Sequence, residues 1–281
     1  MISGTTRVAG IIGDPVRHSL SPVLHNAAYH ALGLDWVYAA FEVPAGATLD
    51  ALAAMRVLDL AGLSVTMPHK TAAAESCDEL SPTAAALHSV NTVHIVDGRL
   101  VGDSTDGAGF LRSVREAGHD VVGASVLVLG AGGAGRAVAH ALGQAGARVV
   151  VSARNPDAAV VAADLAGGTT TPWTNRALAA AQAEVVVNAT SLGMAGTSAA
   201  GEVVVGPEAL HPGQVVADLV YHPRETALIV GARARGAAVV DGLGMLVHQA
   251  AIQIECWSGL NPPVPAMRAA AEHVLGSAPS A

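Results

Sequence analysis

The chain has 281 residues, of which 51% are hydrophobic and 14% charged, and its formal net charge is −8 at pH 7. This composition excludes a disordered protein and fits one large domain or two modest ones with a buried core. The acidic balance argues against a nucleic-acid partner, the charge-free stretch 121–135 is shorter than the ~20 apolar residues of a membrane helix, and Met1 to Gly10 lacks the pattern of a signal peptide.

Cysteine, histidine and lysine narrow the function further. Cys77 and Cys256 lie far apart and form no C-x-x-C pattern, so we predict a cytoplasmic protein with two buried thiols. The 12 histidines form no H-x-H, H-E-x-x-H or Cys/His cluster, which predicts no metal site. Lys70 is the one lysine among 15 basic residues. Codon bias in a GC-rich genome explains why lysine is rare, but not why this position remained lysine.

The N-terminal third is predicted to alternate strands with helices. The pair Ser21-Pro22 is typical of an N-cap followed by the first position of a helix. Strands are expected at Arg7–Gly13, Trp36–Val43, Leu60–Thr66, Asn91–Val96 and Arg99–Gly102, the last two joined by an Asp97-Gly98 turn, and helices at Ser21–Leu34 and Ala45–Met55.

The middle of the chain has a different pattern. After a helix at Asp106–Ala117, the stretch Ala124–Leu129 is continuously apolar, as in a parallel strand buried on both faces. A glycine loop and a helix to about Ala145 follow. Further strands are expected at Arg148–Ser152, Glu184–Asn188, Val215–Leu219 and Ala237–Val240, and a last helix near Gly244–Ser258, before a frayed tail at Gly276–Ala281.

These elements predict an α/β protein of two domains. Residues 1–104 form an N-terminal α/β domain for substrate binding and catalysis, and residues 105–242 form a Rossmann-like, doubly wound dinucleotide-binding domain. Residues 243–281 are expected to supply C-terminal helices that pack back on the first domain.

A glycine-rich loop opens the second domain. Its residues match the dinucleotide-binding pattern G-x-G-x-x-G between a buried strand and a helix: Gly130, Ala131, Gly132, Gly133, Ala134 and Gly135. The three glycines of the pattern permit a tight turn, close approach of a pyrophosphate, and close packing of the helix on the strand. The alternative is a glycine-rich turn in an alanine-rich protein, and it leaves the flanking strand and helix unexplained.

The choice of cofactor follows from the end of the next strand. An NAD site has an acidic residue there to accept from the ribose 2′-hydroxyl. Here the chain reads Ser152-Ala153-Arg154, with no acid before Asp157. The planar, charged guanidinium of Arg154 suits a 2′-phosphate, so NADP is favoured. A solvated loop arginine is the alternative.

Two serines precede or open the first helix. Ser19 and Ser21 present hydroxyls beside free N–H groups, which suits an anion such as a carboxylate. A turn residue followed by an N-cap explains the same pair equally well.

Further polar residues stand where other strands meet helices. Thr66 ends a strand and Lys70 opens a helix, while Asp106 opens another helix and Asn91 begins a strand between them. Lysine and aspartate at two strand-to-helix turns of one domain can converge at the edge of a cleft.

Taken together, these motifs resemble the shikimate dehydrogenase family, from about Val8 to about Gly259. The motifs that carry the resemblance, in order, are GDPVRHSLSPVLHN, GLSVTMPHK, VNTV, GDSTDGAGF, VLGAGGAGRA, NATSLGM, DLVYHP and DGLGMLVHQA. The resemblance implies reversible, NADPH-dependent reduction of 3-dehydroshikimate to shikimate, in aromatic amino-acid and chorismate biosynthesis.

The resemblance also implies roles for individual residues. Ser19 and Ser21 match the pair that holds the substrate carboxylate, and Lys70 and Asp106 match the catalytic pair. The implied substrate site comprises Ser19, Ser21, Thr66, Lys70, Asn91, Asp106, Tyr221 and Gln249, and the implied cofactor site comprises residues 130–135, Arg154, Thr190, Leu219 and Gly242.

The chain departs from the family at four of these motif positions. Ser64 and Ser104 stand where many members carry asparagine, and Ala153 stands where asparagine is common. Ala158 replaces a frequent second basic residue for the 2′-phosphate. This last departure bears on how strictly NADP is preferred over NAD.

Reduction of a ketone requires a hydride at carbon and a proton at oxygen. Lys70 is the predicted proton donor, because an ammonium can lose and regain a proton once its surroundings lower its pKa. Asp106 would orient Lys70 and accept from a ring hydroxyl. Its negative charge would raise the lysine pKa, so desolvation has to oppose it.

Two alternatives remain open at this point. One is an NAD(P)-dependent quinate/shikimate dehydrogenase of the same fold, and the other is a non-catalytic NADP-binding sensor. We expect a small-molecule substrate, a monomer or homodimer, and no membrane or nucleic-acid partner.

Overall fold

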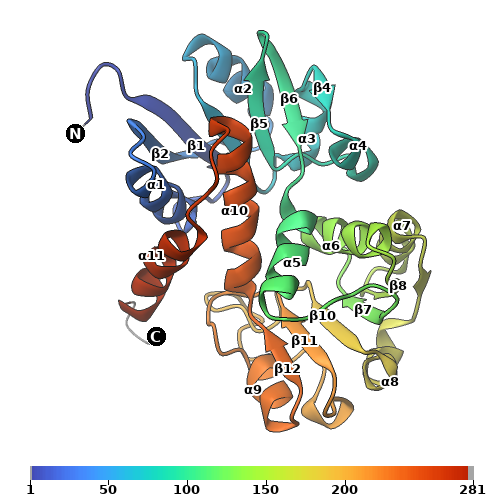
Figure 1. The fold of residues 1–281 in the computed structure, drawn as a ribbon. Helices are drawn as coiled ribbons and strands as arrows, with labels where there is room; N and C mark the ends of the chain where they lie inside the picture. Colours follow the sequence, from blue (N-terminus) through green and yellow to red (C-terminus); the bar gives the residue numbers. More distant parts are fainter. Residues whose placement is uncertain (1, 278–281) are drawn as a thin grey trace. The chain divides into compact units, whose positions relative to one another are not determined.

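The computed structural model describes residues 2–277, and strands alternate with helices along most of this length (Figure 1). The described chain divides into two compact units. The first comprises residues up to Thr105 together with those from Gln249 onward, and the second comprises Asp106–His248. The sequence-based prediction placed these boundaries near residues 104 and 242.

The first unit is built on a mixed sheet of six strands. These are β1 (Arg7–Gly13), β2 (Trp36–Glu42), β3 (Gly62–Val65), β4 (Glu79–Leu80), β5 (Thr92–Val96) and β6 (Arg99–Asp103). Their order is β2-β1-β3-β5-β6-β4. β1 pairs in parallel with β2 and β3, whereas β5 runs antiparallel to β3 and β6. The helices are α1 (Ser21–Ala31), α2 (Thr48–Val57), α3 (Lys70–Ser76), α4 (Pro82–Leu87), α11 (Val264–Ser277) and the C-terminal part of α10 (Gly242–Ser258).

Helix α10 packs on the first sheet through an aromatic side chain. A Cβ added to Gly62 of β3 would lie 2.1 Å from Cδ2 of Trp257, so only glycine leaves room for the indole. Trp257 is 9% exposed and stacks on the His25 ring, with 5.5 Å between centroids. The helix face that carries Trp257 is therefore fixed against β3 and α1.

The second unit is a parallel, doubly wound sheet. Its strands are β7 (Ser125–Leu129), β8 (Arg148–Ser152), β9 (Thr169–Thr170), β10 (Val185–Asn188), β11 (Val215–Asp218) and β12 (Ala238–Val240), and they are arranged in the order β12-β11-β10-β7-β8-β9. The helices are α5 (Asp106–Glu116), α6 (Gly133–Gln144), α7 (Pro156–Ala166), α8 (Arg176–Gln182), α9 (Ala227–Ala234) and the start of α10, with short 3-10 turns η1 (Trp173–Asn175) and η2 (Pro207–Ala209).

This strand order is that of a Rossmann fold, and it reverses direction between β7 and β10. In such sheets, ligands bind beyond the carboxyl ends of the strands at that reversal. Val126 and Val128 of β7 belong to one core cluster, and Leu127 and Leu129 belong to the other. Both faces of β7 are thus covered, which explains its continuous apolar sequence.

The predicted α/β fold class is confirmed, but several details differ. Helix α1 ends at Ala31, the short strands β4 and β9 were not predicted, and the bounds of α11 were not anticipated. The predicted frayed tail at 276–281 lies largely outside the described residues. Among the described helices, none is long and apolar enough to cross a membrane.

The prediction of two buried thiols is wrong for Cys256. Cys256 is exposed and Cys77 is half-buried. Cys256 precedes the buried Trp257 on α10, and its Sγ lies 3.4 Å from Nδ1 of His94 on β5, where it remains open to solvent. Neighbouring atoms still keep water from part of each thiol, and this partial desolvation raises the pKa of each to about 11.

Candidate active site

Of the two serines at the start of α1, Ser19 precedes the helix and Ser21 belongs to it. Ser21 is the first residue of α1 and is 5% exposed, and its backbone N–H donates to Oγ of Ser19 at 3.2 Å. The predicted role of Ser21 as N-cap is wrong. Leu20 is the N-cap residue and makes no side-chain capping bond, because the chain enters the helix one residue earlier.

A buried tyrosine lies beside Ser21. Tyr38 of β2 is 3% exposed, and its hydroxyl donates to Oγ of Ser64 at 2.7 Å. Burial raises the pKa of Tyr38, and hydrogen bonds with Ser64 and Ser21 oppose this rise. The hydrogen bond to Ser64 therefore links the side chain of Tyr38 on β2 to β3. Sequence analysis missed Tyr38, because a tyrosine in a strand carries no signal of function.

His25 of α1 completes this buried group. Its ring stacks on Tyr38 with 4.0 Å between centroids, and its Nδ1 lies 2.9 Å from the carbonyl oxygen of Ser21. Burial lowers the pKa of His25 to about 4, so the ring is neutral near pH 7. A neutral ring that donates from Nδ1 holds the first turn of α1 in place.

Asn91 is held on both sides of its amide. Its Nδ2 donates to Oγ1 of Thr105 at 3.0 Å, and its Oδ1 accepts from the backbone N–H of Thr105 at 2.9 Å. Oγ1 of Thr105 also lies 3.2 Å from the carbonyl oxygen of Gln249. Asn91 and Gln249, both predicted substrate residues, are thus joined through Thr105, which the sequence analysis did not single out. β5 begins at Thr92, one residue later than predicted.

Lys70 stands close to Asn91 along the backbone of the first unit. Lys70 is the first residue of α3, and its carbonyl oxygen accepts from the N–H of Val90, the neighbour of Asn91, at 3.0 Å. Thr66 follows β3, and its N–H donates to the carbonyl oxygen of Ile12 at 3.0 Å. Backbone hydrogen bonds therefore connect Thr66 to β1, and Lys70 to the segment that carries Asn91.

The remaining two predicted substrate residues belong to the second unit. Asp106 is the first residue of α5, is 9% exposed and directly follows Thr105 in the chain. Tyr221 follows β11, and burial raises the pKa of its hydroxyl.

The glycines of the loop after β7 differ in why they are glycine. Gly130 has φ +106°, and a Cβ there would lie 2.8 Å from the carbonyl oxygen of Ala189. A Cβ on Gly135 would lie 2.2 Å from the carbonyl oxygen of Gly130. Gly132 and Gly133 have no atom within 4 Å of an added Cβ, and neither has a positive φ. The fold therefore requires glycine at residues 130 and 135, but it does not require glycine at residues 132 and 133.

Open space at Gly132 and Gly133 fits a bound pyrophosphate. α6 begins at Gly133, and no side chain caps this end of the helix. A phosphate group at this position would meet backbone N–H groups and the positive end of the helix dipole. The loop therefore fits a dinucleotide.

The loops after β10 and β11 are joined by a buried network. Asn188 Nδ2 donates to Oδ1 of Asp218 at 2.9 Å, and Asn188 Oδ1 accepts from Oγ1 of Thr190 at 2.7 Å. Asp218 Oδ2 accepts from Oγ1 of Thr226 at 2.6 Å. Burial raises the pKa of Asp218, and its three hydrogen bonds oppose this rise. The network fixes Thr190, a predicted cofactor residue, to β10 and β11.

Leu219 and Gly242 approach each other in the second unit. A Cβ on Gly242 would lie 2.5 Å from the carbonyl oxygen of Leu219. Glycine at the start of α10 therefore permits close contact with the loop after β11. These two predicted cofactor residues stand together with Thr190 at the carboxyl ends of β10 and β11.

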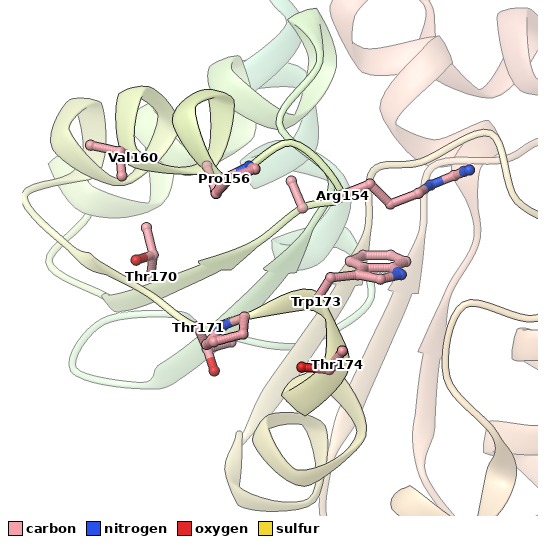
Figure 2. Close-up of a pocket in the computed structure, with 10 residues that line it drawn as sticks. Arg154, Pro156, Val160, Thr170, Thr171, Trp173 and Thr174 are labelled. Atoms are coloured by element: carbon pink, nitrogen blue, oxygen red, sulfur yellow. The ribbon is translucent and has the colours of Figure 1, made fainter.

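Arg154 lines a cavity of about 350 Å³ beyond β8. Its other walls include Pro156 and Val160 of α7 and the segment Thr170–Thr174. Figure 2 shows Arg154 and Trp173 at one side of this cavity and Val160 and Thr170 at the other. The side chain of Asn155 caps α7, since its Oδ1 accepts from the N–H of Ala158 at 3.1 Å. Sequence analysis missed Trp173.

No group of three or more His, Cys, Asp or Glu side chains suited to a metal ion occurs among residues 2–277. His69 illustrates how a histidine of this region is used instead. Its Nδ1 lies 2.9 Å from Oγ1 of Thr48 and its Nε2 lies 2.9 Å from the carbonyl oxygen of Val43, so both ring nitrogens have protein partners.

Comparison with known families covers most of the chain. Residues 11–93 match the model of the shikimate dehydrogenase substrate binding domain, and residues 242–272 match that of the shikimate 5'-dehydrogenase C-terminal domain. Residues 125–220 match a model described as NADP oxidoreductase coenzyme F420-dependent.

Individual relatives agree with the family models. A shikimate dehydrogenase (NADP(+)) of Moorella thermoacetica is 42% identical over 98% of this chain and 96% of its own length. The crystal structure of a Thermus thermophilus shikimate 5-dehydrogenase in complex with NADP(H) and shikimate is 38% identical, with a TM-score of 0.88 over 96% of this chain and all of the other. A quinate dehydrogenase of Corynebacterium glutamicum in complex with NAD is 32% identical, with a TM-score of 0.88 over 95% of this chain and 99% of the other.

One unit is a Rossmann fold with a glycine loop, and the other is an α/β unit with a buried polar site. Together they define a dinucleotide-binding protein of the two-unit oxidoreductase type. The identity to the Moorella protein over nearly the whole length specifies which one. The chain belongs to the shikimate dehydrogenase family.

Proposed function

We propose that the chain is an NADP-dependent shikimate dehydrogenase that interconverts shikimate and 3-dehydroshikimate. The observation that carries this proposal is the site in the first unit. There, Ser21, Asn91 and Gln249 are held by hydrogen bonds, and the backbone of Lys70 is bonded to Val90, the neighbour of Asn91. The relatives named for shikimate and NADP support the same function.

Binding of the substrate falls to the polar residues of this site. The hydroxyls of Ser19 and Ser21 would hold the carboxylate, because they stand at the start of α1, where the helix dipole favours an anion. Thr66, Asn91 and Gln249 would bind the ring hydroxyls, and Tyr221 would complete the pocket. The Asn91 amide is well suited to this role, since Thr105 fixes its orientation.

Proton transfer falls to Lys70. When NADP is bound it exchanges a hydride with the substrate carbon, and the chain has to supply or remove the proton at oxygen. The ammonium of Lys70 would donate that proton and stabilise developing negative charge on the oxygen. Asp106 would orient Lys70 and accept from a neighbouring ring hydroxyl. Arginine cannot replace lysine here, because guanidinium stays protonated near neutral pH.

The cofactor would be held by the second unit. The backbone at residues 130–135 would bind the pyrophosphate, Arg154 the 2′-phosphate, and Thr190, Leu219 and Gly242 would line the remainder of the cofactor site. We further place the enzyme in the cytoplasm, as a monomer or homodimer with a small-molecule substrate and no nucleic-acid partner.

A steady-state comparison of shikimate and quinate, each with NADP and NAD, tests the proposal. We expect the largest kcat/KM for shikimate with NADP. The reaction is monitored by its absorbance at 340 nm. A larger kcat/KM for quinate with NAD would assign the chain to quinate oxidation instead, as in the Corynebacterium relative. No absorbance change with any of the four pairs would indicate a non-catalytic NADP-binding protein.

A further inference from the structure

Gln253 is a buried amide that no predicted role uses. It lies on α10 one turn after Gln249, and it is 2% exposed. A buried amide is costly unless its oxygen and its N–H groups find partners. The partners of Gln253 therefore show what this residue is for.

Both ends of the Gln253 side chain bind residues around the substrate site. Its Oε1 accepts from Oγ of Ser64 at 2.8 Å, and its Nε2 donates to the carbonyl oxygen of Asn91 at 3.2 Å. The same carbonyl oxygen accepts from the backbone N–H of Val65 at 2.8 Å. Gln253 thus bridges the neighbouring strands β3 and β5 at the point where Asn91 enters the site.

The bridge extends toward the serine end of the site. Ser64 accepts from the hydroxyl of Tyr38, whose ring stacks on that of His25 with 4.0 Å between centroids. Nδ1 of His25 in turn lies 2.9 Å from the carbonyl oxygen of Ser21. One amide on α10 therefore connects to Asn91 on one side and to Ser21 on the other.

We infer that Gln253 is a positioning residue, which sets the spacing between the carboxylate-binding serines and the hydroxyl-binding Asn91. This inference rests on the proposed function, because it assigns those two groups to one substrate. Ser64 supports it. Its hydroxyl donates to Gln253 and accepts from Tyr38, so it carries the bridge from α10 to β2.

The test replaces Gln253 by methionine, which has a similar length and no hydrogen-bonding amide. Gln214 offers a matched control in the second unit. It is 1% exposed, its Nε2 donates to the carbonyl oxygens of Ala180 and Ala183 at 2.7 and 2.8 Å, and its Oε1 accepts from the N–H of His211. Gln214→Met removes an equally buried amide away from the proposed substrate residues of the first unit.

We expect Gln253→Met to raise KM for shikimate at least tenfold while KM for NADP stays within twofold of the unmodified enzyme. Gln214→Met should leave both KM values within twofold, even where it lowers the melting temperature as much. Equal effects of the two variants, or a KM for shikimate within twofold in Gln253→Met, would overturn the inference. An unmodified enzyme that does not oxidise shikimate would overturn the proposed function first, and the inference with it.

Ser64→Ala is the second variant, and it tests the inference in case Gln253→Met does not fold. It removes the Ser64 end of the bridge together with the acceptor of the Tyr38 hydroxyl, and we expect at least a threefold rise in KM for shikimate. In the folded double variant the two increases should not multiply, because both break the same hydrogen bond. An unchanged KM for shikimate in Ser64→Ala would contradict the bridge.

Discussion

Gly132 and Gly135 belong to one loop, yet they should respond differently to alanine. A Cβ at residue 135 would lie 2.2 Å from the carbonyl oxygen of Gly130, so backbone has to move. Such overpacking costs about 1–3 kcal/mol. For a unit of this size, this corresponds to a fall in melting temperature of roughly 3–9 °C. At residue 132 the new Cβ meets no atom within 4 Å, and φ is −72°. Gly132→Ala should therefore melt within about 2 °C of the unmodified chain.

Addition of NADP should distinguish the variants in a second way, through the size of the NADP-induced rise in melting temperature. A ligand at a hundred times its Kd stabilises the folded state by about 2.7 kcal/mol, which is roughly 8 °C for this chain. If a methyl group at residue 132 weakens pyrophosphate binding tenfold, the same NADP concentration gives only about 1.4 kcal/mol, or roughly 4 °C. Gly132→Ala should thus lose about half of the shift.

Thermal unfolding with and without NADP measures both effects. Gly133→Ala is a useful companion, since it also meets no atom within 4 Å and adds helix propensity at the first residue of α6. The full NADP shift in Gly132→Ala would refute a pyrophosphate at this loop. An unchanged melting temperature in Gly135→Ala would refute the packing argument.

Three further predictions concern single side chains. Lys70→Ala and Lys70→Arg should each lose most of kcat, at least tenfold, while KM for shikimate changes much less, because only an amine can exchange the proton near neutral pH. Arg154→Leu should raise KM for NADP at least tenfold and leave KM for NAD within about twofold, because only NADP has the 2′-phosphate. Since the pKa of His25 is lowered from 6.5 to about 4, the unfolded chain binds more protons between these values. This contribution to stability is complete above pH 6.5 and is lost as the pH falls, by about 2 kcal/mol at pH 5.

Each of these predictions has a result that would contradict it. Turnover of Lys70→Arg within tenfold of the unmodified enzyme would remove Lys70 from proton transfer. Equal losses with NAD and NADP in Arg154→Leu would mean that this residue does not read the 2′-phosphate. For His25, urea unfolding at pH 7 and pH 5 is compared with the same pair of measurements on His25→Phe. An equal pH difference in both proteins would rule out the histidine as its source.

Local patterns in the sequence were sufficient to predict the second unit. The apolar stretch at β7, the glycines after it and the strand ending at Ser152 are neighbours in the chain, so their meaning depends on few distant contacts. Gly135 shows the limit of such patterns. Its motif predicts close packing, whereas only the structure shows that the carbonyl oxygen of Gly130 is the atom in the way.

The first unit was harder to predict because its site depends on distant residues. Ser64 and Gln253 are 189 positions apart, and neither has a spacing that suggests the other. Ser21 resembled an N-cap in sequence, but in the structure Leu20 is the N-cap residue, and Ser21 contacts His25 through its carbonyl oxygen. Cys256 was expected to be buried from its residue type alone, yet in the structure it is exposed beside His94 of β5.

The position of the single lysine at the start of α3 has a practical consequence for spectroscopy. In protein grown with isotope-labelled lysine, one side chain alone would contribute a signal, and that side chain is Lys70. Its chemical shift can be followed through a pH titration in the free protein and again with substrate or cofactor bound. The protonation equilibrium of the proposed proton donor is therefore open to direct observation, without a variant and without spectral assignment.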